Sequence, residues 1–282
     1  MLDDERARFG YFLLPGWYLS ISRLKFFSEK VSWVFVNPAP IFILSLLACS
    51  GVSAWFFICF SLAFLSWQAV YEIGYLHNDA ITTINEKKPT LRVSDWYRRY
   101  IVDNFFVISV CRFGLFLSCL FVISIVPDDV LSLNLEKYVV VVIIAAVSFF
   151  AHNSIRSRFN IITYFFLSST KYLALPLLFY AGERPLYFIL IIIMIFPFLR
   201  TMEHARKSKY EFYVLSVLFK DVDLVRPLYY LAGSLIFWLL FFLDIASESL
   251  WGAIIFTYFL VFRTSTFFYS RFFERHVPDA YK

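Results

Sequence analysis

Long apolar segments separated by short polar connections dominate the pattern of this chain. Eight of them approach the length of a membrane-spanning helix, which is about 17–25 residues. They lie at residues 33–50, 54–77, 101–126, 137–152, 161–181, 185–200, 226–243 and 249–265. Pro38 and Pro40 interrupt the first segment, so we expect that helix to be kinked or only partly inserted. The pattern predicts an all-α fold, a polytopic membrane helix bundle with about eight transmembrane helices.

The composition agrees with this class of protein. Of the 282 residues, 60% are hydrophobic and 22% are aromatic, which is more apolar material than the core of a soluble domain needs. No linker divides the sequence, and we expect residues 1–282 to form a single domain. The start of the chain, up to Lys30, is charged and then amphipathic, which predicts an interfacial helix and not a signal peptide. The four cysteines fall inside apolar segments without metal-ligand spacing, and we expect them to be core residues.

The basic residues indicate how the helices are oriented. Lysine and arginine are frequent in the N-terminal segment, in the connections after the second, fourth and sixth apolar segments, and in the C-terminal tail. The connections on the other side contain Lys137 and Arg184 as their only basic residues. The positive-inside rule therefore places both termini and the basic connections in the cytoplasm. We expect an integral protein of a bacterial inner (cytoplasmic) membrane.

Three ionisable residues, Glu72, Arg112 and Lys171, are predicted to lie inside the membrane. A bare cation there costs roughly 2.5–3.5 kcal/mol or more, so each group should have a partner or face a polar cavity. One interpretation is a structural ion pair of Glu72 with Arg112 or with Lys171. The other, which we favour, is a central cavity that opens to the cytoplasmic side and holds an anionic head group.

A polar cluster begins where the second apolar segment leaves the membrane. Glu72, Asp79 and Glu86 recur every seven residues and therefore share one face of a continuing helix. Asn78 and Thr82 precede Glu86 at four-residue intervals and lie beside that face. Basic side chains follow at Lys87, Lys88 and Arg92. Acidic oxygens next to basic groups suit a magnesium ion and the phosphates it carries, so we expect chemistry on a phosphorylated lipid or sugar at the membrane surface.

Two more polar clusters end the fourth and sixth apolar segments. If the three helices surround one cavity, acidic and basic groups line its mouth, as a magnesium-bridged diphosphate requires. The expected acidic and amide groups are Asn78, Asp79, Glu86 and Glu203. The expected basic groups and their neighbouring amide are Lys87, Lys88, Arg92, Asn153, Arg156, Arg158, Arg200, Arg206 and Lys207. The histidines at these helix ends (His77, His152 and His204) stand alone, so we expect them to make local hydrogen bonds and not a metal box.

At these positions the sequence resembles the UbiA superfamily of intramembrane prenyltransferases. That family has an Asn-Asp-x-x-Asp-x-x-x-Asp motif at the cytoplasmic end of its second helix. Four residues align with the motif: Asn78, Asp79, Thr82 and Glu86. Residues 87–92 are similar to the basic, proline-containing continuation of the family. A second acidic motif after the sixth helix, often Asp-x-x-x-Asp, is matched by Glu203 alone, because Lys207 stands where the second acid is expected.

The resemblance implies a donor diphosphate held by Mg²⁺. Its carbon–oxygen bond breaks, and an acceptor in the membrane cavity captures the electron-poor carbon. The metal ligands implied are Asn78, Asp79 and Glu86, with Glu203 at a second site. The phosphate-binding residues implied are Arg92, Arg156, Arg158 and Lys171. Asp221 and Asp223, which follow the degraded motif, either replace its missing acid or cap the seventh helix.

The departures from the family pattern affect the choice of substrate. An acid is lost from each motif and Lys207 is gained, which raises the positive potential that the substrates meet. A site that binds two separate anionic substrates needs such a more positive potential. One branch of the superfamily is similar in this respect, because it transfers phosphoribose from phosphoribosyl diphosphate to a polyprenyl phosphate. We therefore favour a polyprenyl-phosphate phosphoribosyltransferase that serves a surface polysaccharide.

Two other functions stay open. The first is an ordinary prenyltransferase that moves a polyprenyl chain from its diphosphate to an aromatic or lipid acceptor. The second is a non-enzymatic transporter of a lipid or solute, for which intramembrane ionisable residues such as Arg112 and Lys171 are typical. The expected partner is a membrane lipid, a polyprenyl phosphate or diphosphate, with a phosphorylated soluble donor in the favoured case, and no nucleic acid is expected.

Overall fold

The computed structural model describes residues 9–85, 91–155, 157–207 and 210–272 of the chain. Every regular element in these ranges is a helix. Seven helices, or eight if a bent pair counts as one span, are long and apolar enough to cross a membrane. These helices coincide with the eight predicted segments, so the prediction of an all-α polytopic bundle is confirmed. By its internal contacts the chain divides into two compact units, Met1–Glu183 and Arg184–Lys282, and the prediction of a single domain stays a prediction.

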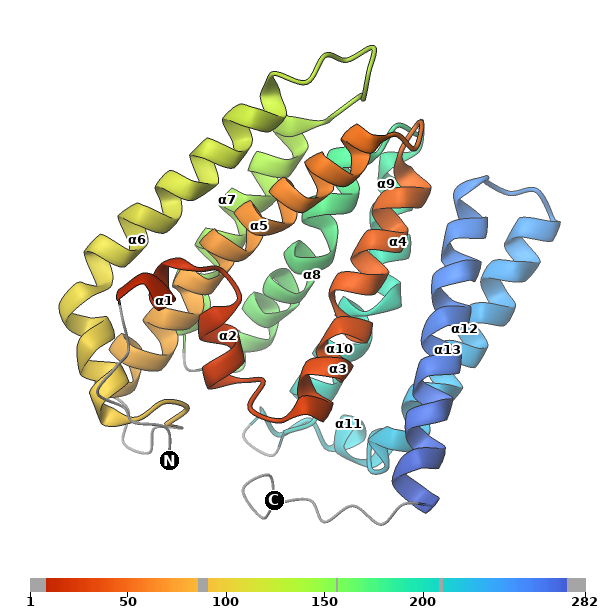
Figure 1. Ribbon diagram of the computed structural model, residues 1–282. Helices are drawn as coiled ribbons and strands as arrows, with labels where there is room; N and C mark the ends of the chain where they lie inside the picture. The colour runs from red at the N-terminus through yellow and green to blue at the C-terminus, as the bar shows by residue number, and fades with distance from the viewer. Residues whose placement is uncertain (1–8, 86–90, 156, 208–209, 273–282) are drawn as a thin grey trace. The chain divides into compact units, whose positions relative to one another are not determined.

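Two central helices, α5 and α8, organise the first unit (Figure 1). Helix α6 packs against α5, α7 packs against both α5 and α8, and α4 packs against α8. The helices of this unit are α1 (Phe9–Leu13), α2 (Trp17–Ser22), α3 (Phe27–Val36), α4 (Pro38–Ala48), α5 (Ala54–Leu76), α6 (Asp95–Ser124), α7 (Leu135–Ser154) and α8 (Asn160–Phe179). The candidate span that contains α8 is two-thirds buried within the protein, 67%, whereas the spans of α6 and α7 leave most of their surface for lipid.

The first span is broken, as its prolines predict. Helix α3 ends at Val36, and α4 begins with Pro38 at its first position, where a missing N–H costs no hydrogen bond. The two pieces together are a candidate span of 22 residues, Phe27–Ala48. Asn37 between them is buried, and its carbonyl oxygen accepts a hydrogen bond from the N–H of Ile41 at 3.2 Å.

Helix α5 changes its winding where its sequence becomes polar. A π-helical turn, η2 (His77–Ile81), follows it, and then a 3₁₀ turn, η3 (Thr82–Asn85). The candidate span therefore extends over Ala54–Ile84, beyond the predicted end at residue 77. A π turn adds one residue to the helical repeat and is frequent at functional sites.

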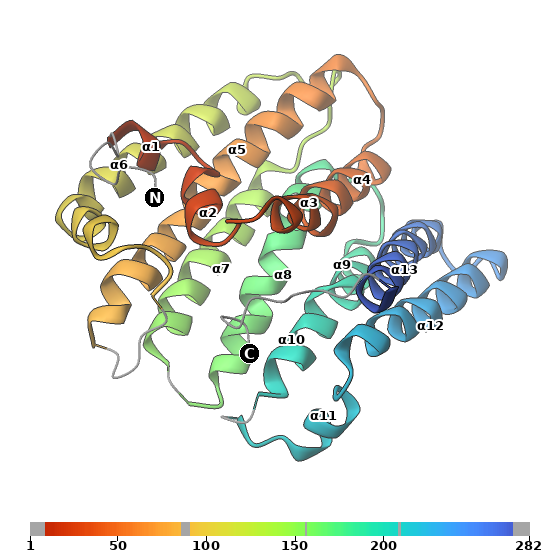
Figure 2. The same cartoon turned by 60° about the horizontal axis from the view of Figure 1, so that its bottom comes forward.

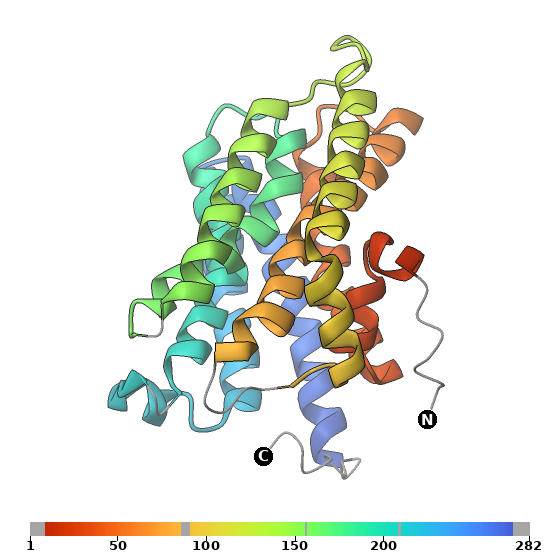
Figure 3. The same ribbon diagram turned by 90° about the vertical axis from the view of Figure 1, so that its left-hand side faces the viewer.

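The N-terminal segment belongs to the core of the first unit. Helices α1 and α2 are joined by a turn at Gly16, whose φ of 88° lies in the left-handed region that glycine tolerates best. Phe12 and Tyr18 are fully buried, and α2 contacts α5 while α1 contacts α6 (Figure 3). The segment that the sequence predicted as interfacial thus contributes side chains to the interior of the bundle.

The second unit consists of α9 (Pro185–Ile195), α10 (Pro197–Ala205), α11 (Tyr213–Leu218), α12 (Val222–Phe242) and α13 (Glu248–Phe272) (Figure 2). Helices α9 and α10 meet at a bend of 43°, at Pro197. Helices α12 and α13 form an antiparallel pair in which Gly233 faces the ring of Phe256 and Gly252 faces the ring of Phe237. Small residues at such positions let membrane helices approach closely.

Candidate functional site

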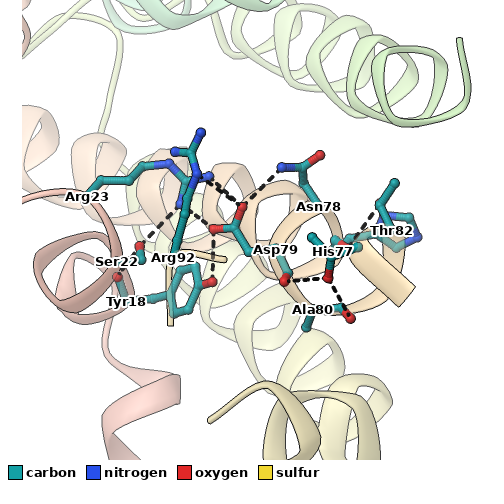
Figure 4. A network of polar contacts seen from close by, with 10 residues as sticks. Tyr18, Ser22, Arg23, His77, Asn78, Asp79, Ala80, Thr82 and Arg92 are labelled. Atoms are coloured by element: carbon teal, nitrogen blue, oxygen red, sulfur yellow. Dashed lines mark hydrogen bonds and ion pairs between the residues drawn. The ribbon is translucent and has the colours of Figure 1, made fainter. Parts of the chain in front are cut away.

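Asp79 is the centre of a polar cluster at the end of α5. Its Oδ2 accepts hydrogen bonds from Arg23 Nη1 at 2.6 Å and from the Tyr18 hydroxyl at 3.0 Å. Its Oδ1 accepts hydrogen bonds from Arg23 Nη2 at 3.0 Å and from Asn78 Nδ2 at 3.0 Å. Arg92 adds a second cation, with its Nε 3.8 Å from Oδ1. We call these five residues the Asp79 cluster (Figure 4).

Three separate segments assemble this cluster. Asp79 lies on the π-helical turn η2, Tyr18 lies on α2, and Arg23 is the residue at which α2 ends. Arg92 comes from the connection that precedes α6. The Arg23 guanidinium also lies over the ring of Tyr75 on α5, 3.9 Å from its centroid, which supports its orientation toward the acid.

The surroundings keep Tyr18 neutral and Arg23 charged. Burial raises the pKa of Tyr18 above its ordinary value near 10, and the negative charge of Asp79 raises it further. Burial disfavours the charged form of Arg23, but the charge and hydrogen bonds of Asp79, together with the nearby Tyr75 and Tyr18, outweigh it and raise the pKa of Arg23. Tyr18 therefore remains a hydrogen-bond donor and Arg23 remains a cation at any physiological pH.

An open pocket of about 240 Å³ adjoins the cluster, and Arg92 belongs to both. Lys25, Arg92 and Ser94 supply the polar groups of its wall. The side chain of Arg92 is 39% exposed, whereas those of Arg23 and Asp79 are 15% and 1% exposed. The acid is thus withdrawn into the protein, and cations face the pocket. This is an arrangement that attracts anions.

Glu72 and Arg112 form an ion pair beneath this cluster. Arg112 Nη1 lies 2.9 Å from Glu72 Oε2, and neither side chain is exposed. Glu72 Oε1 accepts a hydrogen bond from the N–H of Gly16 at 2.9 Å. Arg112 donates from Nε to the carbonyl oxygen of Phe12 at 2.7 Å and from Nη2 to that of Leu14 at 3.3 Å. The pair binds the α1–α2 segment, so in this structure Glu72 has the structural partner that the sequence offered as one of two interpretations.

The other predicted residues of the first unit are more dispersed. Asn153, at the end of α7, is hydrogen-bonded through Nδ2 to His77 Nδ1 at 3.1 Å, which links the polar ends of α5 and α7. Lys171 is half-buried on α8, and Arg158 is exposed just before that helix begins. Glu86, Lys87, Lys88 and Arg156 lie outside the described residues.

The acid of the second predicted motif is also bound by arginine. Glu203 on α10 accepts hydrogen bonds from Arg226 Nε at 2.7 Å and Nη2 at 3.0 Å, and from Arg200 Nη1 at 2.6 Å. We call these three residues the Glu203 cluster. Lys207 is exposed beyond the end of α10. Asp221 caps the start of α12, where its Oδ1 accepts a hydrogen bond from the Leu224 N–H at 3.2 Å, so the predicted capping role is the one observed.

The described residues do not fit a magnesium ion at Asp79. A carboxylate ligand must direct an oxygen lone pair at the ion, but each oxygen of Asp79 already accepts two hydrogen bonds. Arg23 and Arg92 would also repel a divalent cation. Across the described ranges, no group of three His, Cys, Asp or Glu side chains is placed to hold a metal ion.

His152 and His204 make hydrogen bonds to residues nearby in the sequence, as predicted, whereas His77 contacts a residue of another helix. Besides the contact of His77 with Asn153, His152 Nδ1 lies 3.0 Å from the Thr163 hydroxyl. His204 Nε2 lies 2.9 Å from the Tyr210 hydroxyl.

Sequence reasoning missed the arginines that bind the two acids. In the sequence, Arg23 and Arg226 belong only to the positive-inside pattern, and Tyr18 belongs only to the amphipathic N-terminal segment. Arg23 stands 56 positions before Asp79, and Arg226 stands 23 positions after Glu203, so no local spacing connects them. The sequence feature that points to these contacts is an excess of arginine over acidic residues near Asp79 and Glu203. It indicates that each acid pairs with an arginine, but it does not show which arginine.

Comparison with known proteins yields no relative: no protein-family model, curated protein or solved structure matches this chain. The fold defines the protein as an all-α integral membrane protein with helices suited to seven or eight membrane spans. The likeness to the UbiA superfamily rests on the residues of the two motifs alone.

Proposed function

We propose that this protein is an intramembrane transferase of the UbiA type that displaces diphosphate from an activated donor. The favoured reaction transfers phosphoribose from phosphoribosyl diphosphate to a polyprenyl phosphate at the cytoplasmic face of a bacterial inner membrane. The observation that carries the proposal is the Asp79 cluster, where a buried acid holds Arg23 in place beside the exposed Arg92 and an open pocket.

The charge around the pocket suits a phosphate group. Arg23, Arg92 and Lys25 carry three positive charges, and Asp79 carries one negative charge, which leaves an excess of two. A phosphate monoester or a diphosphate group offers the complementary charge and acceptor oxygens. Arginine is suited to this role because its planar fork binds two phosphate oxygens at once.

The bidentate contact with Asp79 has a further consequence for binding. It fixes the Arg23 guanidinium before any substrate arrives, so less side-chain entropy is lost when an anion approaches. Arg92 is at 3.8 Å from the same acid and more exposed, so it is free to turn toward a ligand in the pocket. Fixed and adjustable cations together would hold the leaving diphosphate as its charge develops.

The transfer requires no redox partner. An oxygen of the polyprenyl phosphate attacks the anomeric carbon of the donor, and the bond from that carbon to the diphosphate oxygen breaks. The electron pair of that bond leaves with the diphosphate, which the arginines neutralise. In ordinary prenyl transfer, the alternative reaction, the allylic carbon–oxygen bond breaks in the same way and the acceptor supplies the new bond and releases a proton.

A non-enzymatic lipid or solute transporter is the second candidate, and one observation favours it. Asp79 and Glu203, the acids that the family motifs assign to metal, are each bound by an arginine through two hydrogen bonds. A protein that only binds and releases a phosphorylated lipid needs the cations but no metal.

The test is a donor assay on the purified protein in detergent. Phosphoribosyl diphosphate with polyprenyl phosphate would be run beside polyprenyl diphosphate with an aromatic acid, each with Mg²⁺ and with chelator, and the products identified by mass spectrometry. A lipid that gains a phosphopentose supports the favoured reaction, and a prenylated small molecule supports the alternative. If no mixture gives turnover and lipid binding is retained, the result would contradict the transferase proposal and support the transporter.

A matched pair of variants connects the assay to the pocket. Arg92→Gln is expected to lower kcat/KM by about tenfold to a hundredfold, because a charge-assisted contact to phosphate is lost. Arg98→Gln removes a nearby cation that instead pairs with Asp95 at 3.0 Å, and it should leave kcat/KM within about twofold. Equal losses in the two variants would show that the effect comes from general surface charge.

A further inference from the structure

The second unit contains a group of polar atoms that its own hydrogen bonds leave incomplete. Tyr230 on α12 is fully buried, and its hydroxyl has no hydrogen-bond partner among the residues that the structure describes. Arg263 on α13 has a buried Nε that, within the same described ranges, has no hydrogen-bond partner either. A buried polar group without a partner is costly, and a guanidinium inside a membrane helix costs more, so two such groups close together need an explanation.

These two residues lie within electrostatic range of the Glu203 cluster. Arg263 interacts electrostatically with Arg200, Arg226 and Glu203, and Tyr230 interacts with Arg263, Arg200 and Glu203. Tyr230 is held by ring contacts, and its ring stacks on Phe259 with centroids 5.0 Å apart. The Tyr230 hydroxyl is therefore held in place, and the Arg263 guanidinium, which lies 5.2 Å from the ring centroid of Phe262, contributes an Nε without a hydrogen-bond partner among the described residues.

The charges of this region do not balance. Arg200 and Arg226 both pair with the buried carboxylate of Glu203, and Arg263 is within electrostatic range of all three. Among the described residues, this group of three guanidinium groups and one buried carboxylate has an excess of two positive charges. Asp223 lies 3.4 Å from Arg226 Nη1, but it is 62% exposed and screened by solvent. Arg200 is 37% exposed, so the region is accessible from outside the unit.

We propose that Arg200, Arg226, Arg263 and the Tyr230 hydroxyl form a second anion site, which binds a phosphate monoester or diphosphate group. The ligand supplies acceptor oxygens for the hydroxyl and for Arg263 Nε, and its two negative charges offset the excess of arginine. Glu203 acts as a positioning residue, because its carboxylate accepts hydrogen bonds from both Arg200 and Arg226, which meet at Oε2, and so orients the two guanidinium groups. The site belongs to the second unit alone and does not require the transferase function proposed above.

Binding is tested on the full chain in nanodiscs, with two probes. Inorganic pyrophosphate is titrated by calorimetry, and a polyprenyl monophosphate is added to the disc lipid in a second series. Arg263→Gln is expected to weaken binding of at least one probe by about tenfold or more. Arg271→Gln is the matched control, since this arginine lies two turns further along α13 and pairs with Asp221 at the surface. The Arg271→Gln protein should bind both probes as tightly as the wild type does. The probe that binds identifies the source of the phosphate, a free anion or a lipid head group.

The stability of the ligand-free variants provides a second readout. Arg263→Gln removes an incompletely paired cation, so the ligand-free protein should unfold at the same or a higher temperature than the wild type. Tyr230→Phe should also keep its stability and lose part of the binding, which covers the case in which Arg263→Gln fails to fold. Binding of both probes unchanged in Arg263→Gln and in Tyr230→Phe would overturn the proposal. So would a marked loss of stability in ligand-free Tyr230→Phe, because it would show that the hydroxyl has a structural partner such as a buried water.

The same titrations separate this inference from the proposed function. Arg92→Gln alters the Asp79 cluster and leaves the second unit untouched. If Arg92→Gln abolishes transfer but the Arg263-dependent binding remains, the two sites are independent. If Arg92→Gln loses all anion binding and Arg263→Gln loses none, the proposed site at Arg263 does not exist. Of the two sites, the one at the Asp79 cluster then accounts for all the binding.

Discussion

Arg112 and Glu72 form an ion pair, 2.9 Å from Nη1 to Oε2, in which neither side chain is exposed. Together these two side chains bind the backbone of Phe12, Leu14 and Gly16. These contacts hold the α1–α2 segment in place, so that Tyr18 and Arg23 reach Asp79. A buried charge pair thus positions the residues that bind a second buried acid. The Asp79 cluster depends on contacts made by a different pair of residues, deeper in the same unit.

Breaking this pair should be strongly destabilising. Glu72→Gln leaves Arg112 buried without its counter-charge, and the expected loss is about 3–5 kcal/mol of unfolding free energy. The double variant Glu72→Leu/Arg112→Met, which removes both charges, should lose less than Glu72→Gln alone. Unfolding in mixed micelles measures both. Asp95→Asn serves as the control, because it breaks an exposed pair with Arg98 and should cost less than about 1 kcal/mol. Similar losses for Glu72→Gln and Asp95→Asn would contradict a structural role for the pair.

Removing the Tyr18 hydroxyl should lower the stability of the protein by an amount that does not change between pH 6 and pH 9. The hydrogen bond to Asp79 requires protonated Tyr18, and the folded pKa is raised above its unfolded value near 10. Its contribution is therefore fully present below pH 10 and is lost only as the pH rises through the folded pKa. Tyr18→Phe should lower stability by about 1–3 kcal/mol, by the same amount at pH 6 and at pH 9. Thermal unfolding of both proteins across this range provides the measurement, and a difference that shrinks between these pH values would refute the assignment.

The turn at Gly16 should require glycine. Its φ of 88° strains any residue with a Cβ, although the surrounding space is open, so Gly16→Ala should cost roughly 1–2 kcal/mol. The N–H of Gly16 also donates to Glu72, so a shift of the turn weakens the ion pair. Gly51→Ala is the matched control, because a Cβ there meets open space without a positive φ, and its melting temperature should stay near that of the wild type. Equal melting temperatures for the two variants would show that the backbone of the turn adapts without cost.

The close packing of α12 on α13 should be sensitive to a single methyl group. A Cβ at Gly233 would overlap the ring of Phe256, so Gly233→Ala should destabilise by about 1–3 kcal/mol. Gly114→Ala on α6 should have the opposite sign, because no atom lies within 4 Å of the added Cβ and alanine favours the helix by up to about 1 kcal/mol. The comparison requires only thermal unfolding of the two variants. A stabilised Gly233→Ala would mean that α12 and α13 are packed less tightly than the structure indicates.

The positions of the membrane-spanning helices along the chain were largely predictable from the sequence. Membrane spans are set by continuous apolar length, a local property that needs no knowledge of the rest of the chain. Pro38 marked the break between α3 and α4 for a similar reason, since a missing N–H acts where it stands. The seven-residue interval between Glu72 and Asp79 likewise placed both acids on one side of their helix, and both face the α1–α2 segment.

The partners of those acids were decided only by the tertiary structure. Asp79 matched a metal motif by its neighbours in sequence, but the groups that bind it come from α2 and from the connection before α6. Glu203 is bound in the same way by Arg226 from a later helix. The pairing of charges depends on distance in space, and inside a membrane a nearby arginine outweighs the sequence context of a carboxylate because so little water competes for either. The sequence by itself therefore determined which segments span the membrane and where its acids stand, and the packing of the helices determined what neutralises them.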